Sequence, residues 1–183
     1  MKTIHNLFIP ILSLLVFWSI NSRGQTVEQK DPLNQKILDA AKEIMSSVST
    51  CALITIDSEG RARARAMEFI GPESDFTVWF GTNPNSRKVG QILNDPRVSI
   101  YFTNADDSGY VMYYGLAELV DDKQIKLSKW KPEWEAFYPD QDESFLLIRV
   151  IPEWIEVVSY KHGLVGDSIT WEPPMVRFGK EKK

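Results

Sequence analysis

Residues 61–67 of this chain combine residue types and a spacing that suit the binding of an anion. They alternate as Arg-Ala-Arg-Ala-Arg-Ala-Met. Successive side chains of an extended strand point to opposite faces, so Arg61, Arg63 and Arg65 share one face and the small alanines share the other. Guanidinium groups on one face repel one another unless an anion or acidic neighbours compensate them. Two interpretations stay open: an anion-binding face, or a solvated outer face whose arginines pair with the chain's many acids.

Residues 82–88, which read Thr-Asn-Pro-Asn-Ser-Arg-Lys, form a second candidate site. Ser86 is a suitable N-cap for a short helix, which places Arg87 and Lys88 in the first turn. Free backbone N–H groups and the helix dipole favour an anion at this end, and a phosphate would bind both cations. The alternative is an ordinary capped surface helix. The segment lacks the Gly-Lys-Ser/Thr order of the Walker A phosphate loop.

Most of the elements that would position these residues are short strands. Apolar runs between turn-forming residues predict strands over residues 51–56, 61–70, 76–80, 97–103, 110–120, 144–151 and 154–159. Helices are predicted from residue 32 to the serines at 46–49, over 86–94, and over 121–137 with an interruption before Pro132. Gly115 predicts a bulge in its strand, and the tail from residue 161 is expected to be ordered coil. The hairpin-like connections favour an antiparallel barrel or sandwich over an alternating βαβ sheet.

Composition narrows the possible functions. The chain has 183 residues, of which 43% are hydrophobic, so we expect one domain with a substantial core. Its net charge of −4 argues against generic nucleic-acid binding. Cys51 is the one cysteine, and His162 is the one histidine after the first 24 residues, so disulfides, Cys/His metal sites and Cys-x-x-Cys redox chemistry are excluded. A bound cofactor is therefore expected to carry any chemistry, and no metal site is predicted.

The first 24 residues have the layout of a secretory signal peptide. Lys2 gives a positive start, residues 7–20 are mostly apolar, and a polar segment follows. A single N-terminal anchor is the alternative. We expect an exported protein, periplasmic or secreted, that has no membrane contact after cleavage. The expected organisation is a signal peptide over residues 1–24, a barrel domain over 25–160 and a C-terminal tail over 161–183.

The stretch over residues 51–120 resembles the flavin-binding split barrel of the pyridoxamine 5'-phosphate oxidase superfamily. The segments that carry the resemblance are residues 52–60, 63–67, 79–82, 86–88, 93–102 and 115–120. Residues 127–139 and 146–150 are similar to the general-stress branch of that superfamily. In total, the resemblance covers residues 32–160.

The resemblance implies a mainly β fold, a split antiparallel β-barrel, in a homodimer that binds FMN in grooves between the two barrels. By the family pattern the cofactor-binding residues are Arg63, Arg65, Ala66 and Met67 along the flavin, Thr82 near its ring, Ser86, Arg87 and Lys88 at its phosphate, and Tyr110. Tyr110 stands where the oxidase has a glutamine, and residues 171–174 replace its C-terminal Arg-x-His substrate motif. These departures argue against oxidation of vitamin B6 and leave cofactor binding intact.

Two classes of function follow from these features. The first is an exported FMN-dependent oxidoreductase that acts on a small molecule. The second is a non-catalytic carrier of flavin or haem, linked to the stress response. Cys51 is expected to be an inert buried thiol and His162 an isolated surface residue. Trp79, Trp130, Trp134, Trp154 and Trp171 are expected to anchor the core or an interface, with stacking platforms as the alternative.

Overall fold

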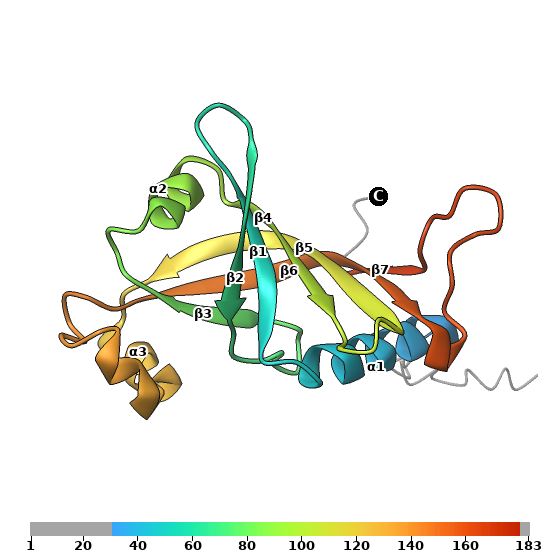
Figure 1. The fold of residues 1–183 in the computed structure, drawn as a ribbon, viewed down its shortest axis with the longest axis horizontal. Coiled ribbons are helices and arrows are strands. Elements are labelled where there is room, and N and C mark those ends of the chain that lie inside the picture. The colour runs from blue at the N-terminus through green and yellow to red at the C-terminus, as the bar shows by residue number, and fades with distance from the viewer. Residues whose placement is uncertain (1–30, 180–183) are drawn as a thin grey trace, which may run out of the picture.

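The computed structural model describes residues 31–179, which form a curled antiparallel sheet with helices around it (Figure 1). The predicted signal peptide over residues 1–24 lies outside the described residues. Within residues 31–179, no helix combines the length and apolar character that crossing a membrane requires.

The sheet contains seven strands in the order β2-β1-β4-β5-β6-β3, with β7 added beside β6. The strands are β1 Thr50–Ile56, β2 Ala62–Glu68, β3 Val78–Thr82, β4 Arg97–Thr103, β5 Gly109–Val120, β6 Leu146–Ser159 and β7 Met175–Arg177. The α-helices are α1 Pro32–Ser46, α2 Arg87–Asn94 and α3 Lys123–Lys129, and the 3-10 helices are η1 Pro132–Ala136 and η2 Tyr160–His162. Paired strands run antiparallel throughout, as the hairpin connections predicted.

The two edge strands, β2 and β3, meet at one point. Just beyond β2, Ile70 pairs with Trp79 of β3 through two backbone hydrogen bonds of 2.8 and 2.9 Å. Along its length β2 pairs only with β1 among the described residues. The sheet is therefore a barrel that closes at one bridge and is split along the rest of β2.

Glu68 and Glu73 hold the α3–η1 segment and β3 together beside this closure. Glu68 accepts hydrogen bonds from Nε1 of Trp134 at 2.8 Å and from Nζ of Lys131 at 2.6 Å. Glu73 accepts from Nε1 of Trp79 at 3.0 Å. Burial raises the pKa of Glu68, but Lys131 and Trp134 outweigh it and keep the pKa of this carboxyl below its usual value. The end of β2 is thus tied to a segment more than sixty residues away.

The inner face of the sheet forms the core. Strand β1 buries alternate residues, among them Cys51 and Leu53, as its apolar pattern predicted. Cys51 is a free, buried cysteine, as predicted, and burial raises the pKa of its thiol to about 12. Helices α1 and α2 add buried side chains: Ile37, Ala40, Ala41, Ile44 and Met45 from α1, and Val89 and Ile92 from α2.

The opposite face of β2, β1, β4 and β5, here called the outer face, carries small and aromatic side chains. The strand register aligns Ala66, Ala52, Tyr101 and Met112 in one row and Ala64, Ile54, Ser99 and Tyr114 in the next. These side chains are exposed or half-buried. Tyr114 continues the second row by stacking on Trp154 of β6, with ring centroids 4.6 Å apart. The outer face is therefore an accessible apolar surface.

Strand β6 runs unbroken over residues 146–159, so the prediction of two strands there was wrong. Pro152 lies opposite Gly115, where the β5–β6 register shifts after Tyr114. A bulge is a place where a sheet tolerates proline, which explains why the strand continues. The shift confirms the bulge predicted at Gly115. A Cβ at this glycine would lie 2.3 Å from the carbonyl oxygen of Ile151.

Two further element predictions need correction. The tail from residue 161 is not only coil, because η2 overlaps its start and β7 pairs residues 175–177 with β6. The helix predicted over residues 121–137 is a seven-residue α-helix followed by a 3-10 turn. Asp122 caps α3 by accepting from the backbone N–H groups of Gln124 and Ile125, and the chain leaves the helix at Trp130, before Pro132.

Candidate functional site

Three cationic side chains, Arg65, Arg87 and Lys88, lie around one solvent-open cavity and are called the cation cluster below. Arg65 comes from the middle of β2, whereas Arg87 and Lys88 open α2. The cavity has a volume of about 470 Å³, and Asn85 and Ser86 complete its lining. The structure therefore brings together the two basic segments that the sequence singled out.

Arg65 is fixed by polar groups of the barrel's inner face. Its Nη1 donates to Oγ1 of Thr55 at 2.8 Å and to the carbonyl oxygen of Leu53 at 3.3 Å. Its Nη2 donates to Oε1 of Gln91 on α2 at 3.1 Å, and Oγ1 of Thr55 donates to the same oxygen at 2.6 Å. A guanidinium has five N–H donors, so Arg65 keeps donors for a ligand. Thr55 and Gln91 therefore act as positioning residues for Arg65.

A second network joins the end of β3 to the start of α2. Nζ of Lys88 donates to Oγ1 of Thr82 at 2.9 Å, and that oxygen lies 3.0 Å from Oγ of Ser86. Ser86 occupies the N-cap position of α2, as predicted, but its side chain makes no capping hydrogen bond. The first N–H groups of a helix have no partner within the helix. The uncapped N-terminus of α2 therefore adds donors beside the cation cluster.

No carboxylate in the described part of the chain forms an ion pair with the cation cluster. Every arginine or lysine that forms an ion pair within residues 31–179 is a residue other than Arg65, Arg87 and Lys88. Burial, followed by the charges of Arg63 and Arg87, lowers the pKa of Arg65. Burial, followed by the charge of Arg65, lowers the pKa of Lys88. The folded chain thus holds these charges less favourably than the unfolded chain does, which is the electrostatics of an anion site.

The predicted row of arginines does not act as a unit. Nε of Arg61 pairs with Oδ2 of Asp57 at 3.0 Å, and Nη1 of Arg63 lies 3.6 Å from the same oxygen. Arg61 also pairs with Glu59 at 2.9 Å. Acids of the β1–β2 turn therefore pair with two of the three arginines, in accord with the alternative interpretation, and Arg65 is the one of the three that lines the cavity.

The remaining predicted site residues divide between the two faces of the sheet. Met67 pairs with Cys51 and packs against the core, on the same face as Arg65. Ala66 and Tyr110 lie on the outer face, where the Tyr110 ring is 5.6 Å from that of Tyr101. Within one chain, Tyr110 is thus on the opposite side of the sheet from Arg65. Their predicted roles at a flavin stay predictions.

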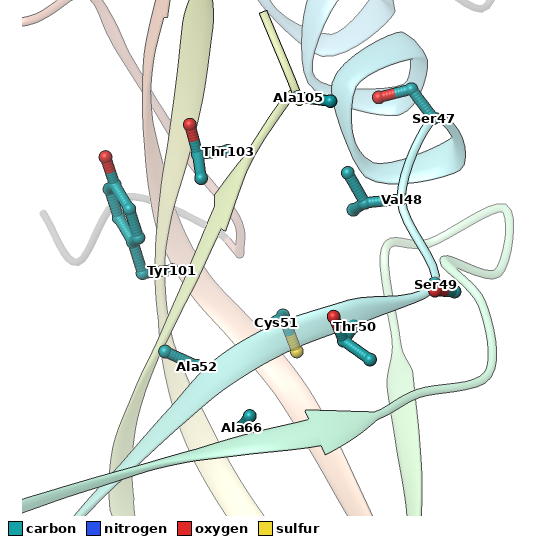
Figure 2. Close-up of a pocket in the computed structure, with 10 residues that line it drawn as sticks. All are labelled: Ser47, Val48, Ser49, Thr50, Cys51, Ala52, Ala66, Tyr101, Thr103 and Ala105. Carbon is teal, nitrogen blue, oxygen red and sulfur yellow. The ribbon is translucent and has the colours of Figure 1, made fainter. Parts of the chain in front are cut away.

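A cavity of about 500 Å³ opens on the outer face beside the end of α1 (Figure 2). Its lining is uncharged and consists of Ser47, Val48, Ser49, Thr50, Cys51, Ala52, Ala66, Tyr101, Thr103 and Ala105. Nothing in this lining compensates an anion. The cavity is a hollow in the apolar outer face and is distinct from the cation cluster.

The contacts of His162 give no signal in the sequence pattern. The residue is not isolated, because its Nδ1 lies 2.8 Å from Oγ of Ser159 and its Nε2 lies 3.2 Å from Oε2 of Glu43. These partners come from the end of β6 and from α1, and sequence spacing alone does not connect α1 with the tail. Thr55 and Gln91 were missed for the same reason. Within residues 31–179, no three His, Cys, Asp or Glu side chains gather to hold a metal ion.

Comparison with known proteins matches residues 36–167 to the family described as pyridoxamine 5'-phosphate oxidase like. Protein bli-3 of Neurospora crassa is 29% identical over 111 residues, which cover 60% of this chain and 53% of that protein, about half its length.

Solved structures share the fold. The General Stress Protein 26 from Bacillus anthracis aligns with a TM-score of 0.61 at 22% identity, over 80% of this chain and 98% of that chain. A pyridoxamine 5'-phosphate oxidase-related, FMN-binding protein from Nostoc punctiforme aligns with a TM-score of 0.53 at 19% identity, over 82% and 98% of the two chains. At these identities the likeness concerns the fold, and it confirms the predicted split barrel.

Because the charges of the cation cluster have no carboxylate partner among the described residues, removing one of them should not destabilise the folded protein. Lys88→Met removes one of the crowded charges, so the free energy of unfolding without a bound anion should rise or change by less than about 0.5 kcal/mol. Lys131→Met is the matched control, because this half-buried lysine is paired with Glu68 and its loss should lower stability by about 1 kcal/mol. Urea unfolding in a buffer free of multivalent anions measures both. A larger loss for Lys88→Met than for Lys131→Met would contradict the interpretation of the cluster.

Proposed function

Because the chain belongs to the pyridoxamine 5'-phosphate oxidase like family, we propose that it binds FMN and acts as a flavin-dependent oxidoreductase on a small molecule. The observation that carries the proposal is the cation cluster, whose charges have no carboxylate partner among the described residues. The FMN-binding description of the Nostoc punctiforme relative supports the choice of cofactor.

The residues around the cavity fit the phosphate of FMN. A phosphate monoester carries a charge of about −1.5 to −2 at pH 7 and has three strong acceptor oxygens. Arg65 and Arg87 would donate paired N–H groups, Lys88 would add a point charge, and Ser86 and the N-terminus of α2 would supply further donors. Their summed charge exceeds that of the phosphate, so binding relieves the repulsion within the cluster.

When bound, the flavin supplies the electron and hydride transfer. Side chains of this chain position the groups that would bind the cofactor: Thr55 and Gln91 fix Arg65, and Thr82 orients Lys88. The cavity lining contains no histidine or carboxylate, so these residues bind and orient rather than transfer protons. Pyridoxamine 5'-phosphate is not the proposed substrate, since the family's Arg-x-His motif is absent from the tail.

A homodimer is part of the proposal, and the outer face is its interface. Rows of alanine beside tyrosine and tryptophan form a surface on which a second copy can pack closely. A two-fold contact uses the same patch on both copies, and it would cover the uncharged cavity of Figure 2. Export is also proposed, on the sequence of residues 1–24 alone.

The proposed binding of the FMN phosphate by the cation cluster, called the phosphate clamp, is tested by comparing FMN with riboflavin, which lacks the phosphate. Lys88→Ala should weaken FMN binding by about 1.5–3 kcal/mol, roughly tenfold to a hundredfold, because one charge-assisted contact is lost. Riboflavin should bind the wild type more weakly than FMN and respond little to Lys88→Ala. Lys123→Ala, an exposed lysine paired with Asp142, is the control and should change neither affinity. Flavin fluorescence titration at fixed salt measures the affinities, and equal binding of FMN and riboflavin would remove the basis for the clamp.

The dimer is tested by placing a charge on the outer face. Ala64→Glu should convert the dimer to a monomer, because a carboxylate in the centre of the interface would be buried without a partner. Gln124→Glu, on the exposed side of α3, is the matched control and should stay dimeric. Light scattering measures the mass of each. A wild-type monomer, or a dimeric Ala64→Glu variant, would refute this interface.

Repeated reduction and reoxidation of the bound flavin would distinguish an oxidoreductase from a non-catalytic flavin carrier. A nicotinamide dinucleotide should reduce the flavin, and a small-molecule acceptor should reoxidise it over repeated cycles. Absorbance near the oxidised flavin band follows both half-reactions. A flavin that stays oxidised with either nicotinamide donor and is reduced only by dithionite would favour the carrier function.

A further inference from the structure

A serine, a histidine and a glutamate form a connected set of hydrogen-bonding groups at the end of β6, called the polar triad below. Oγ of Ser159 lies 2.8 Å from Nδ1 of His162, and Nε2 of His162 lies 3.2 Å from Oε2 of Glu43. Ser159 ends β6, His162 belongs to η2 and Glu43 belongs to α1. In Figure 1, α1 and α2 lie at opposite ends of the sheet. The polar triad is therefore separate from the cation cluster, and FMN binding does not account for it.

The backbone holds His162 beside Ser159. N–H of Ser159 donates to the carbonyl oxygen of Leu164 at 2.8 Å, and N–H of Leu164 donates to the carbonyl oxygen of Ser159 at 2.9 Å. Gly163, just before Leu164, has a φ of 59°, which glycine adopts without a steric penalty. The side chain of Leu164 is buried in the core. The turn that carries His162 is thus fixed at both ends.

Lys161 holds the carboxylate of Glu43 in place. Nζ of Lys161 donates to Oε1 of Glu43, which leaves Oε2 to face His162. The hydrogen bond from Lys161 outweighs the effect of burial and keeps the pKa of Glu43 below its usual value. Glu43 is therefore an ionised acceptor at neutral pH.

The ionised carboxylate determines where the proton of a neutral imidazole lies. A carboxylate only accepts hydrogen bonds, so Nε2 of His162 carries the proton and donates to Glu43. Nδ1 is then an acceptor, and the hydroxyl of Ser159 donates to it. A serine hydrolase uses the same order of groups, in which a carboxylate orients a histidine that accepts the serine proton. Here the two ring nitrogens have exchanged places.

A cavity of about 280 Å³ gives access to the serine. Ser159 is only 3% exposed, but it lines this cavity together with Glu43, Lys161 and Asn104, so a molecule that enters the cavity reaches its hydroxyl. Oδ1 of Asn104 is buried and accepts no hydrogen bond among the described residues. A buried acceptor without a partner suits the donor of a bound molecule or water. The cavity therefore combines space for a small molecule with a hydroxyl that a base can deprotonate.

We propose that the polar triad gives the protein a second activity, the hydrolysis of esters that have a short acyl group. Ser159 is the nucleophile, His162 is the general base and acid, and Glu43 is a positioning residue that orients His162. The size of the cavity limits the length of the acyl group. Lys161 is the cation of the described lining and supplies positive charge for the oxyanion. This activity requires no flavin and does not depend on the proposed FMN binding.

The reaction consists of two acyl transfers. Oγ of Ser159 bonds to the carbonyl carbon while its proton passes to Nδ1 of His162. The ester C–O bond then breaks, and the departing alcohol takes the proton from Nδ1. Water next bonds to the acyl carbon and gives a proton to Nδ1, and the bond to Oγ breaks as Oγ regains that proton. The products are a carboxylic acid and an alcohol, and no oxidant or reductant is consumed.

Hydrolysis of p-nitrophenyl acetate by the purified protein tests the activity. Ser159→Ala should lower the rate at least about tenfold, because the nucleophile is lost. Ser128→Ala, which removes an exposed serine hydroxyl on α3, is the matched control and should keep the wild-type rate. p-Nitrophenyl decanoate should react at least about tenfold more slowly than the acetate, since its acyl chain does not fit the cavity.

Chemical rescue distinguishes a catalytic role of His162 from a structural one. His162→Ala should lose activity, and free imidazole should restore part of it, because the small base can occupy the vacated space. His162→Gln fills that space and should not respond to imidazole. Glu43→Gln should lower kcat with little change in KM, because the amide keeps the contact but loses the charge that stabilises the imidazolium. Circular dichroism checks that each variant is folded.

Covalent labelling tests the nucleophile without any variant. Methanesulfonyl fluoride, a small reagent that sulfonylates activated serine hydroxyls, should abolish the activity and modify Ser159, which peptide mass spectrometry locates. An unmodified Ser159, or a Ser159→Ala variant that hydrolyses the acetate at the wild-type rate, overturns the proposal. Either result leaves the proposed FMN binding untouched.

Discussion

Electrostatic repulsion among the three cationic side chains of the cation cluster is the constraint on which the arrangement of the site depends. The fold places Arg65, Arg87 and Lys88 around one cavity whose lining, within the described residues, contains no carboxylate. Partial burial of Arg65 and Lys88 strengthens the repulsion because water no longer screens it fully. Hydrogen bonds to Thr55, Gln91 and Thr82 offset part of this cost. These three partners lie on β1, α2 and β3, and Arg65 itself lies on β2, so the positions of the charges depend on both edge strands of the sheet.

Closure of the barrel brings those edges into reach of one another. A single backbone bridge between Ile70 and Trp79 joins the ends of β2 and β3, and Glu68 ties the same corner to Trp134. The loop after β3 then delivers the N-terminus of α2 to the middle of β2. The α3–η1 segment thus contributes to the site without lining its cavity, because it holds the corner from which both basic segments are positioned.

Much of the fold could be predicted from the sequence, because local patterns dominate it. Apolar runs and the turn residues between them located β1 to β5 within a few residues and covered β6 with two predicted strands, and Gly115 marked its bulge. The prediction of two strands over residues 144–159 was wrong, because the sheet tolerates Pro152 opposite the bulge in the neighbouring strand. β7 has only three residues and little signal of its own, and its pairing with β6 depends on where residues 163–174 return the chain.

The types of residue in the site could be predicted from the sequence, but which of them come together around the cavity could be predicted only in part. Strand periodicity put Arg61, Arg63 and Arg65 on one side, but the acids that neutralise the first two lie in the preceding turn, whose geometry the pattern did not specify. Ser86 was correctly placed at the helix start, yet its hydroxyl turns to Thr82 rather than to the helix backbone. Long-range side-chain partners such as Gln91 leave no periodic signal, and only the folded chain identifies them.

The split along β2 leaves a row of backbone N–H and C=O groups without strand partners among the described residues. Such an edge is a template on which further copies could add without limit, as in fibrous aggregates. The arginines of β2 and of the turn before it oppose that growth, because adding an identical strand at this edge would bring like guanidinium groups together. The alanines on the other face place no such barrier against a flat contact between sheets. The alternation of large charged and small apolar residues thus discourages open-ended polymerisation while permitting a closed assembly.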